Sequence, residues 1–239
     1  MGPMNIVAVV AQKGGTGKST LASNLAVAAH RAGLRTLAID ADPQGSLVQW
    51  KRARGSDGPA VQPGKTSTLH PMRFAAERSG VELTVIDTRA SALDNSLEAA
   101  KAAQLTLIVA RPTPIDIRAI SATIEALRPL QRPLAIVLNQ APALRGGREP
   151  LAVTEAVEAL GVYGLPIAPA VVRARAAYQS AFMRGASPLE LAPKGAAAGE
   201  INQLWTYVDA RLRQAALLVR APLAARTRPR PPLIQAVAV

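Results

Sequence analysis

The chain has 239 residues, of which 49% are hydrophobic, and carries a formal net charge of +12. This length and composition fit one packed domain of α/β size and exclude general disorder. Cysteine is absent and histidine occurs twice, which excludes disulfides, iron–sulfur clusters and cysteine zinc sites and argues against a histidine-built metal site.

Short apolar runs alternate along the chain with segments of helical periodicity, which is typical of a parallel sheet covered by helices. The predicted strands are Ile6–Ala11, Thr36–Ile39, Val81–Ile86, Leu105–Ala110, Leu134–Leu138 and Gly164–Ile167. Apolar residues at helical spacing are clearest in residues 21–32, 117–127 and 201–212. We therefore predict an α/β fold with a doubly wound, mostly parallel sheet flanked by helices.

The first predicted strand runs directly into a glycine-rich loop and then into a helix. The loop reads QKGGTGKST over residues 12–20, and its glycines allow backbone N–H groups to surround phosphate oxygens. Lys18 would reach the β- and γ-phosphates, and Ser19 would coordinate Mg²⁺. The strict phosphate-loop pattern requires glycine where Gln12 stands. The predicted phosphate contacts are Gly14, Gly15, Thr16, Gly17, Lys18, Ser19 and Thr20.

Acidic residues follow the next two predicted strands. Asp40 and Asp42 project to the same side at the carboxyl edge of the sheet, where nucleotides bind, and Asp87 follows the third strand. An aspartate at a strand end is by itself more typical of a helix cap or turn. Three such acids behind a phosphate loop instead indicate a nucleotide site, in which Asp87 would hold Mg²⁺ through water.

Two loops and a basic end complete the organisation of the chain. Lys51–Lys65 is basic and rich in glycine and proline, and Ala141–Pro150 carries a Gly-Gly pair flanked by arginines. Residues 211–239 contain six arginines and no acidic residue, so they hold half of the net charge. We predict one domain over residues 1–213 and a basic, arginine- and proline-rich tail over residues 214–239.

The charge suggests a polyanionic partner, either nucleic acid or an anionic membrane surface, although solubility alone also accounts for a basic composition. The chain has two Trp, three Tyr and two Phe, so recognition of single strands by base stacking is disfavoured. No apolar run approaches the roughly 20 residues of a membrane span. The N-terminus lacks the pattern of a signal peptide, so a cytoplasmic location is expected.

The run KGGTGKST resembles the deviant Walker A box of the ParA/MinD superfamily of dimeric ATPases, which are P-loop NTPases that use ATP and Mg²⁺. Residues 40–44 resemble its DxDPQ acidic box, and Asp87 matches the Walker B position. Residues 42–50, 111–116 and 194–201 are similar to the short ParF-like ParA partition ATPases in particular. The likeness extends over residues 4–213.

This resemblance implies roles for individual residues. Lys13 would be the signature catalytic lysine, which crosses the homodimer interface to the partner's nucleotide. Asp42 would orient or activate the attacking water, and Asp40 would join Ser19 and Asp87 near the metal. Asn139 would contact the adenine base, with Pro166 opening the other wall at residues 166–172.

One segment departs from the family's pattern. ParA proteins usually continue the Walker B acid with a Thr-Pro-Pro stretch, and this chain has Thr88-Arg89-Ala90-Ser91. The sequence leaves open whether Arg89 is a surface residue or a further contact to phosphate or to a partner.

The resemblance also implies a function: an ATP-bound dimer binds duplex DNA without sequence preference, on the nucleoid, until a ParB-like or other cargo adaptor stimulates hydrolysis. The implied DNA contacts are Arg173, Arg175, Arg184, Lys194, Arg211 and Arg213. The phosphate loop begins at residue 13, which leaves no room before it for a helix-turn-helix domain. The alternatives are a MinD-like ATPase on a membrane surface, for which residues 214–220 before Pro222 form a poor anchor, and an ATP-dependent amidating or carboxylating enzyme.

Overall fold

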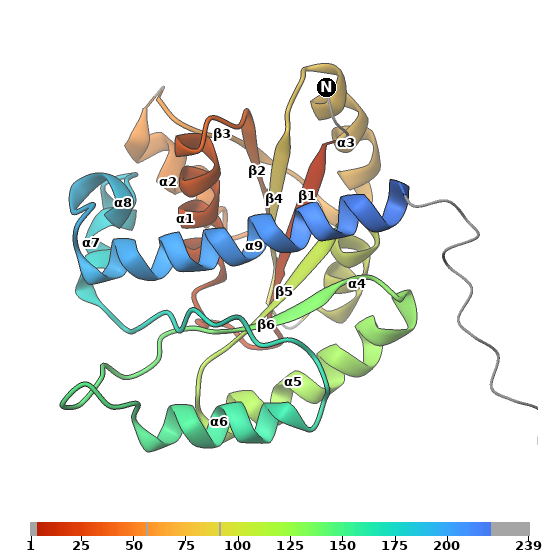
Figure 1. The fold of residues 1–239 in the computed structure, drawn as a ribbon. Coiled ribbons are helices and arrows are strands. Elements are labelled where there is room, and N and C mark those ends of the chain that lie inside the picture. The colour runs from red at the N-terminus through yellow and green to blue at the C-terminus, as the bar shows by residue number, and fades with distance from the viewer. Residues whose placement is uncertain (1–3, 56, 91, 221–239) are drawn as a thin grey trace, which may run out of the picture.

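The computed structural model describes residues 4–55, 57–90 and 92–220 and shows one sheet with helices on both faces (Figure 1). The strands are β1 (Asn5–Val10), β2 (Thr36–Ala41), β3 (Ala60–Pro63), β4 (Leu83–Thr88), β5 (Leu105–Ala110) and β6 (Leu134–Leu138). The α-helices are α1 (Lys18–Arg31), α2 (Ser46–Arg54), α3 (Leu69–Arg78), α4 (Leu93–Ala102), α5 (Pro114–Leu127), α6 (Leu151–Gly161), α7 (Ala176–Met183), α8 (Pro188–Leu191) and α9 (Ala196–Arg220).

The sheet is parallel throughout, with the strand order β3-β2-β4-β1-β5-β6. β1 is central, between β4 and β5, so the loop that follows it emerges in the middle of the carboxyl edge. Parallel strands need crossover helices, and these cover both faces of a doubly wound sheet. The predicted fold class is confirmed.

Alternate residues of each strand serve two separate cores. Val7 and Val9 of β1 pack with α1, α2, α8 and α9, while Ile6, Ala8 and Val10 pack with α3, α4, α5 and α6. This division follows from the two-residue repeat of a strand. In Figure 1, α9 crosses the face of the sheet on which α1 also lies.

Two of the sequence predictions for strands need correction. The loop predicted over Lys51–Lys65 contains β3, which pairs with β2 along the sheet edge from Leu37 to Asp40. The strand predicted at Gly164–Ile167 is wrong, because only Ile167 forms an isolated bridge, to Ile136. Pro166 and Pro169 lack the N–H groups that a continuous ladder requires, so this segment follows β6 with interrupted pairing.

The last helix is longer than the predicted domain. α9 continues through residues 214–220, which the sequence assigned to the tail, and residues 221–239 lie outside the described part of the chain. Within residues 4–55, 57–90 and 92–220, no helix is both long and apolar enough to cross a membrane.

Candidate nucleotide-binding site

The phosphate loop lies between β1 and α1, with two of its three glycines in conformations that other residues adopt only with strain. Gly15 has a φ of 71° and Gly17, which precedes the first turn of α1, has a φ of 84°. A Cβ atom at Gly14 or Gly15 would meet nothing within 4 Å. The loop therefore presents open backbone at the N-terminus of α1, where phosphate oxygens are favoured.

Two amides after β6 fix this loop. Asn139 donates from Nδ2 to the carbonyl of Thr16 at 2.7 Å, and Gln140 donates from Nε2 to the carbonyl of Gly15 at 3.0 Å. A Cβ atom at Gly17 would lie 2.5 Å from Asn139 Nδ2. The structure shows that the Asn139 amide holds the phosphate loop through a backbone carbonyl, and its predicted contact to the adenine base stays a prediction.

A pocket of about 510 Å³ opens over the loop, a size that suits a small-molecule ligand. Lys18, Ser19, Asp42, Arg89 and Phe182 are among the residues that line it. Burial lowers the pKa of Lys18, and the charges of Asp87 and Asp42 act in the opposite direction. The pocket thus gathers the predicted phosphate loop and one predicted catalytic acid in a single cavity.

Asp87 is the buried group that best fits a metal ion. Neither of its carboxylate oxygens accepts a geometrically sound hydrogen bond from the described residues, although the side chain is fully buried at the end of β4. Burial raises the pKa of Asp87 to about 7, opposed by the nearby Ser19 hydroxyl and Lys18 ammonium. An unpaired buried carboxylate beside a hydroxyl matches the oxygen ligands and retained waters of Mg²⁺. No cluster of three potential metal ligands occurs among the described residues.

The two acids at the carboxyl end of β2, Asp40 within the strand and Asp42 just after it, have different surroundings. Asp42 lines the pocket, with Oδ1 accepting the Gln44 N–H at 3.0 Å. Asp40 is buried and accepts the N–H groups of Asp42 at 3.3 Å and Val48 at 3.0 Å. Its oxygens therefore hold the start of α2. Asp40 is also the register partner of Asp87 across β2 and β4, so its place near the metal stays a prediction.

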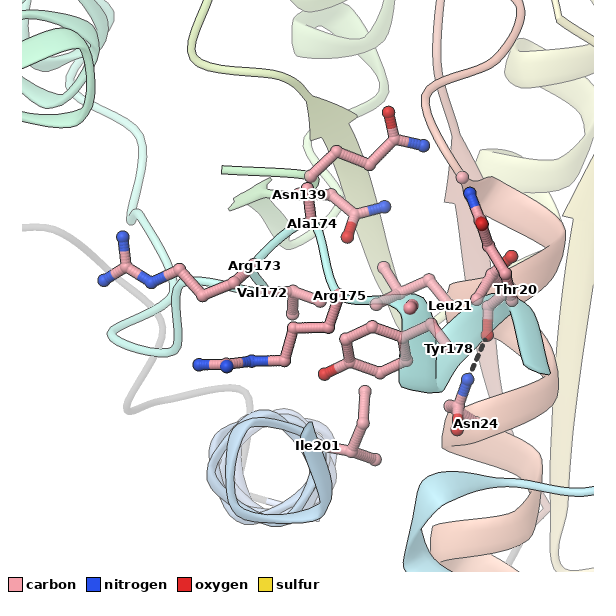
Figure 2. Close-up of a pocket in the computed structure, with 14 residues that line it drawn as sticks. Thr20, Leu21, Asn24, Asn139, Val172, Arg173, Ala174, Arg175, Tyr178 and Ile201 are labelled. Atoms are coloured by element: carbon pink, nitrogen blue, oxygen red, sulfur yellow. Dashed lines mark hydrogen bonds between the residues drawn. The ribbon is translucent and has the colours of Figure 1, made fainter. Parts of the chain in front are cut away.

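A second pocket of about 300 Å³ continues from the first and shares Gly17 and Thr20 with it. Figure 2 shows its walls, with Asn139 on one side and Tyr178 and Ile201 on another. Another wall consists of residues 172–176. Of the predicted segment 166–172 it contains only Val172, and Pro166 is exposed and does not line the pocket. The position next to the phosphate loop makes this pocket suitable for the nucleoside.

Two arginines of the predicted DNA-binding set lie in this wall, and both have internal partners. Arg173 is 6% exposed and its guanidinium binds Glu149 and the carbonyl of Pro142. Arg175 is paired with Glu200 at 2.7 Å, and Glu200 also accepts the hydroxyl of Tyr178 at 2.8 Å. Both arginines shape the nucleoside pocket. Because Arg173 is buried, it is removed from the predicted DNA contacts, whereas Arg175 is partly exposed and its DNA contact stays a prediction.

The other four predicted DNA contacts do not form one cluster. Arg184 follows α7 and Lys194 precedes α9, and both are exposed. Arg211 and Arg213 lie near the far end of α9, where Arg213 pairs with Asp209 at 2.9 Å. The eighteen helical residues from Ala196 to Arg213 span about 27 Å. Arg184 and Lys194, which precede the helix, therefore lie far from Arg211 and Arg213.

The two remaining cations face different sides of the phosphate loop. Lys13 lies in a small crevice with Asp116 and Ile120 of α5 and does not line its own phosphate pocket. Arg89 does line that pocket, and no described residue gives its side chain a hydrogen bond or ion pair. Sequence reasoning left Arg89 open, and the structure places it among the residues that would surround phosphates.

Known proteins support this assignment. The family model described as CobQ/CobB/MinD/ParA nucleotide binding domain matches residues 7–189. The "Maintenance of carboxysome distribution protein A" of Gloeobacter kilaueensis is 34% identical over 212 residues, which cover 84% of this chain and 94% of that protein. Its namesake from Halothiobacillus neapolitanus is 30% identical over 218 residues, covering 84% and 95%.

Solved structures share the fold at lower identity. The ATP complex of a Cyanothece McdA variant superposes with a TM-score of 0.70 at 15% identity, covering 89% of this chain and 98% of that one. Pyrococcus horikoshii MinD with Mg-ADP gives 0.68 at 18% identity, covering 86% and 96%. With the matched family, the phosphate loop and the buried acid at the end of β4, the chain belongs to the CobQ/CobB/MinD/ParA nucleotide-binding family and is a P-loop ATPase of the ParA/MinD type.

Proposed function

We propose that this chain is a positioning ATPase that dimerises with ATP, binds duplex DNA without sequence preference and is released when a cargo adaptor stimulates hydrolysis. The observation that carries the proposal is the 34% identity over nearly the whole length of a protein named for the maintenance of carboxysome distribution. The same name belongs to the second relative. Both support a large cytoplasmic body as the cargo.

The geometry of the site supports the dimer. Lys13 does not line the phosphate pocket of its own chain and instead lines the crevice beside α5, as expected of a lysine that serves a partner's nucleotide. A cation that arrives from a second chain stabilises charge on the transferred phosphoryl group in the manner of an arginine finger. Hydrolysis then depends on dimerisation, which allows DNA and the adaptor to control it.

The test is the Asp42→Ala variant. Asp42 lines the phosphate pocket. Its Oδ1 accepts the Gln44 N–H, and no described residue donates a hydrogen bond to its Oδ2. We expect turnover to fall by about 10²–10⁴-fold, the usual contribution of a general base, while ATP binding persists. The variant should therefore remain on arbitrary duplex DNA in ATP, measured by co-sedimentation or fluorescence anisotropy.

Asp94→Asn, at an exposed position in the first turn of α4, is the matched control and should turn over ATP like the wild type. Rapid turnover by Asp42→Ala would contradict the role of Asp42. Binding of ATP-loaded wild type to anionic liposomes with no change in DNA binding would replace the DNA proposal by the MinD-like alternative.

A further inference from the structure

A tight hairpin over residues 142–149, called the arginine hairpin below, projects between β6 and α6 at the edge of the molecule (Figure 1). Arg145 and Arg148 exchange backbone hydrogen bonds of 3.1 and 3.0 Å. Gly146 and Gly147 between them have φ values of 55° and 76°. Two central residues with positive φ form the turn that matches the twist of a hairpin, so the tip has a defined shape.

This turn places both arginine side chains on one face. Directly opposite residues of an antiparallel pair point to the same side, with Cα atoms about 5.5 Å apart when they are hydrogen-bonded. Like charges in this arrangement destabilise a hairpin. Both side chains are exposed, and neither has a hydrogen bond or ion pair with any residue that the structure describes. An anion bound between them would remove the repulsion.

The acidic residue of the hairpin, Glu149, already forms an ion pair with Arg173. Glu149 accepts hydrogen bonds from Nη1 and Nη2 of Arg173, and Arg173 Nη1 also donates to the carbonyl of Pro142 at 2.9 Å. One buried guanidinium therefore holds both ends of the hairpin. Since Arg173 also lines the nucleoside pocket (Figure 2), the hairpin is fixed to a wall that a bound nucleotide would contact.

We propose that the arginine hairpin binds phosphates of duplex DNA through Arg145 and Arg148, and that Arg173 and Glu149 couple this contact to the occupancy of the nucleoside pocket. The inference rests on the proposed DNA binding and assigns it a surface. Duplex DNA offers one charge per about 1.7 Å of helix axis, so two adjacent guanidinium groups find phosphates in any register. The sequence PALRGGRE contains no aromatic side chain, which favours phosphate contact without base stacking.

The first experiment compares two doubly substituted full-length chains. Arg145→Gln with Arg148→Gln removes the proposed contacts. Arg78→Gln with Arg132→Gln makes the same change of charge at exposed positions before β4 and β6. These positions lie at the amino ends of the strands, whereas the hairpin follows the carboxyl end of β6. Binding to an arbitrary duplex is measured from 50 to 200 mM salt with a non-hydrolysable ATP analogue. The slope of log affinity against log salt should flatten by about 1.8 for the hairpin variant alone, and basal ATP turnover should not change.

The outcomes separate the two proposals. A wild-type slope in the hairpin variant would overturn the arginine hairpin as a DNA contact and leave DNA binding itself intact. Failure of the wild type to bind DNA in any nucleotide state would overturn both. An unchanged slope together with lost adaptor-stimulated turnover would assign the hairpin to a protein partner and likewise overturn the DNA contact.

A second variant tests the coupling. Glu149→Gln keeps both hairpin arginines but weakens the tie to Arg173, whose bond to the Pro142 carbonyl remains. We expect the ratio of DNA affinities in the ATP-analogue and ADP states to move toward one, with the melting temperature confirming that the variant folds. A wild-type ratio would remove the coupling from the proposal.

Discussion

At the scale of single residues, the unpaired carboxylate of Asp87 makes the nucleotide-free protein sensitive to pH. Burial raises its pKa from 3.8 to about 7, so between these values the folded chain keeps a proton that the unfolded chain has lost. Stability contributed by this group is therefore present at low pH and is lost as the pH rises through the window up to about 7. Mg²⁺ binding requires the deprotonated form and should weaken below about pH 7.

Asp87→Asn removes this charge while preserving the size of the side chain. We expect the nucleotide-free variant to be more stable than the wild type at pH 8 by at least ~1 kcal/mol, or ~2–4 °C in melting temperature for a chain of this length. The difference should shrink toward pH 5. Thermal melts from pH 5 to 8 measure it, and Mg²⁺-dependent nucleotide binding should be lost in the same variant.

Glu125→Gln, an exposed position in α5, is the control and should melt like the wild type across the range. Equal melting curves for Asp87→Asn and wild type at pH 8 would show that the buried carboxylate carries no such cost.

At the scale of elements, α2 connects the Asp42 loop to the α7–α8 turn. α2 begins just after this loop, and its C-terminal half is bound to the segment between α7 and α8 and to α8 itself. The indole N–H of Trp50 donates to the Ala186 carbonyl at 3.1 Å, and Arg54 pairs with Glu190 at 2.5 Å. The guanidinium of Arg54 lowers the pKa of Glu190 against the opposing effect of burial. Movement of α7 and α8 would therefore be transmitted toward Asp42.

Gly185 is the closest backbone contact in this junction. It has a φ of 65°, and a Cβ atom there would lie 2.1 Å from the backbone nitrogen of Arg54. Gly185→Ala should destabilise the fold by about 3 kcal/mol or more, because strain and backbone overlap add. Gly33 has a similar φ of 88°, but a Cβ atom there would meet nothing within 4 Å. Gly33→Ala should therefore destabilise the fold by only about 1–2 kcal/mol. Urea unfolding compares them, and equal losses would contradict the close approach.

The sequence predicted those elements whose signal is local. β5 and β6 coincide with the predicted runs, since a buried parallel strand is continuously apolar. β3 has three exposed residues out of four, so its pattern carries no such signal. The pairing of Arg173 with Glu149 and of Arg175 with Glu200 joins residues 24 and 25 positions apart. Such partners are fixed by tertiary packing, and the arginines alone suggested only a basic surface.

At the scale of the whole molecule, the cations define two kinds of surface. Lys18 and Arg89 face the phosphate pocket of their own chain, and Lys13 lies on the α5 side of the loop. Arg184 and Lys194 lie before α9, and Arg211 and Arg213 lie in its C-terminal half, so under the proposed function a single chain would offer duplex DNA separated contacts. Two chains related by a two-fold axis would double each contact, so we expect the proposed binding to DNA to be tighter in a dimer than in a single chain.

The dimeric use of Lys13 is tested by complementation. Lys13→Ala and Lys18→Ala should each be inactive alone, the first for lack of the partner's lysine and the second for lack of its own phosphate contact. In an equal mixture, half of the dimers contain one of each chain, and each mixed dimer holds one site with both lysines. ATP turnover should therefore return to roughly a quarter of the wild-type value. Because neither chain carries both lysines, recovery requires a lysine that acts across the interface. A mixture that stays inactive while mixed dimers form, as detected by differently tagged chains, would place Lys13 at the nucleotide of its own chain.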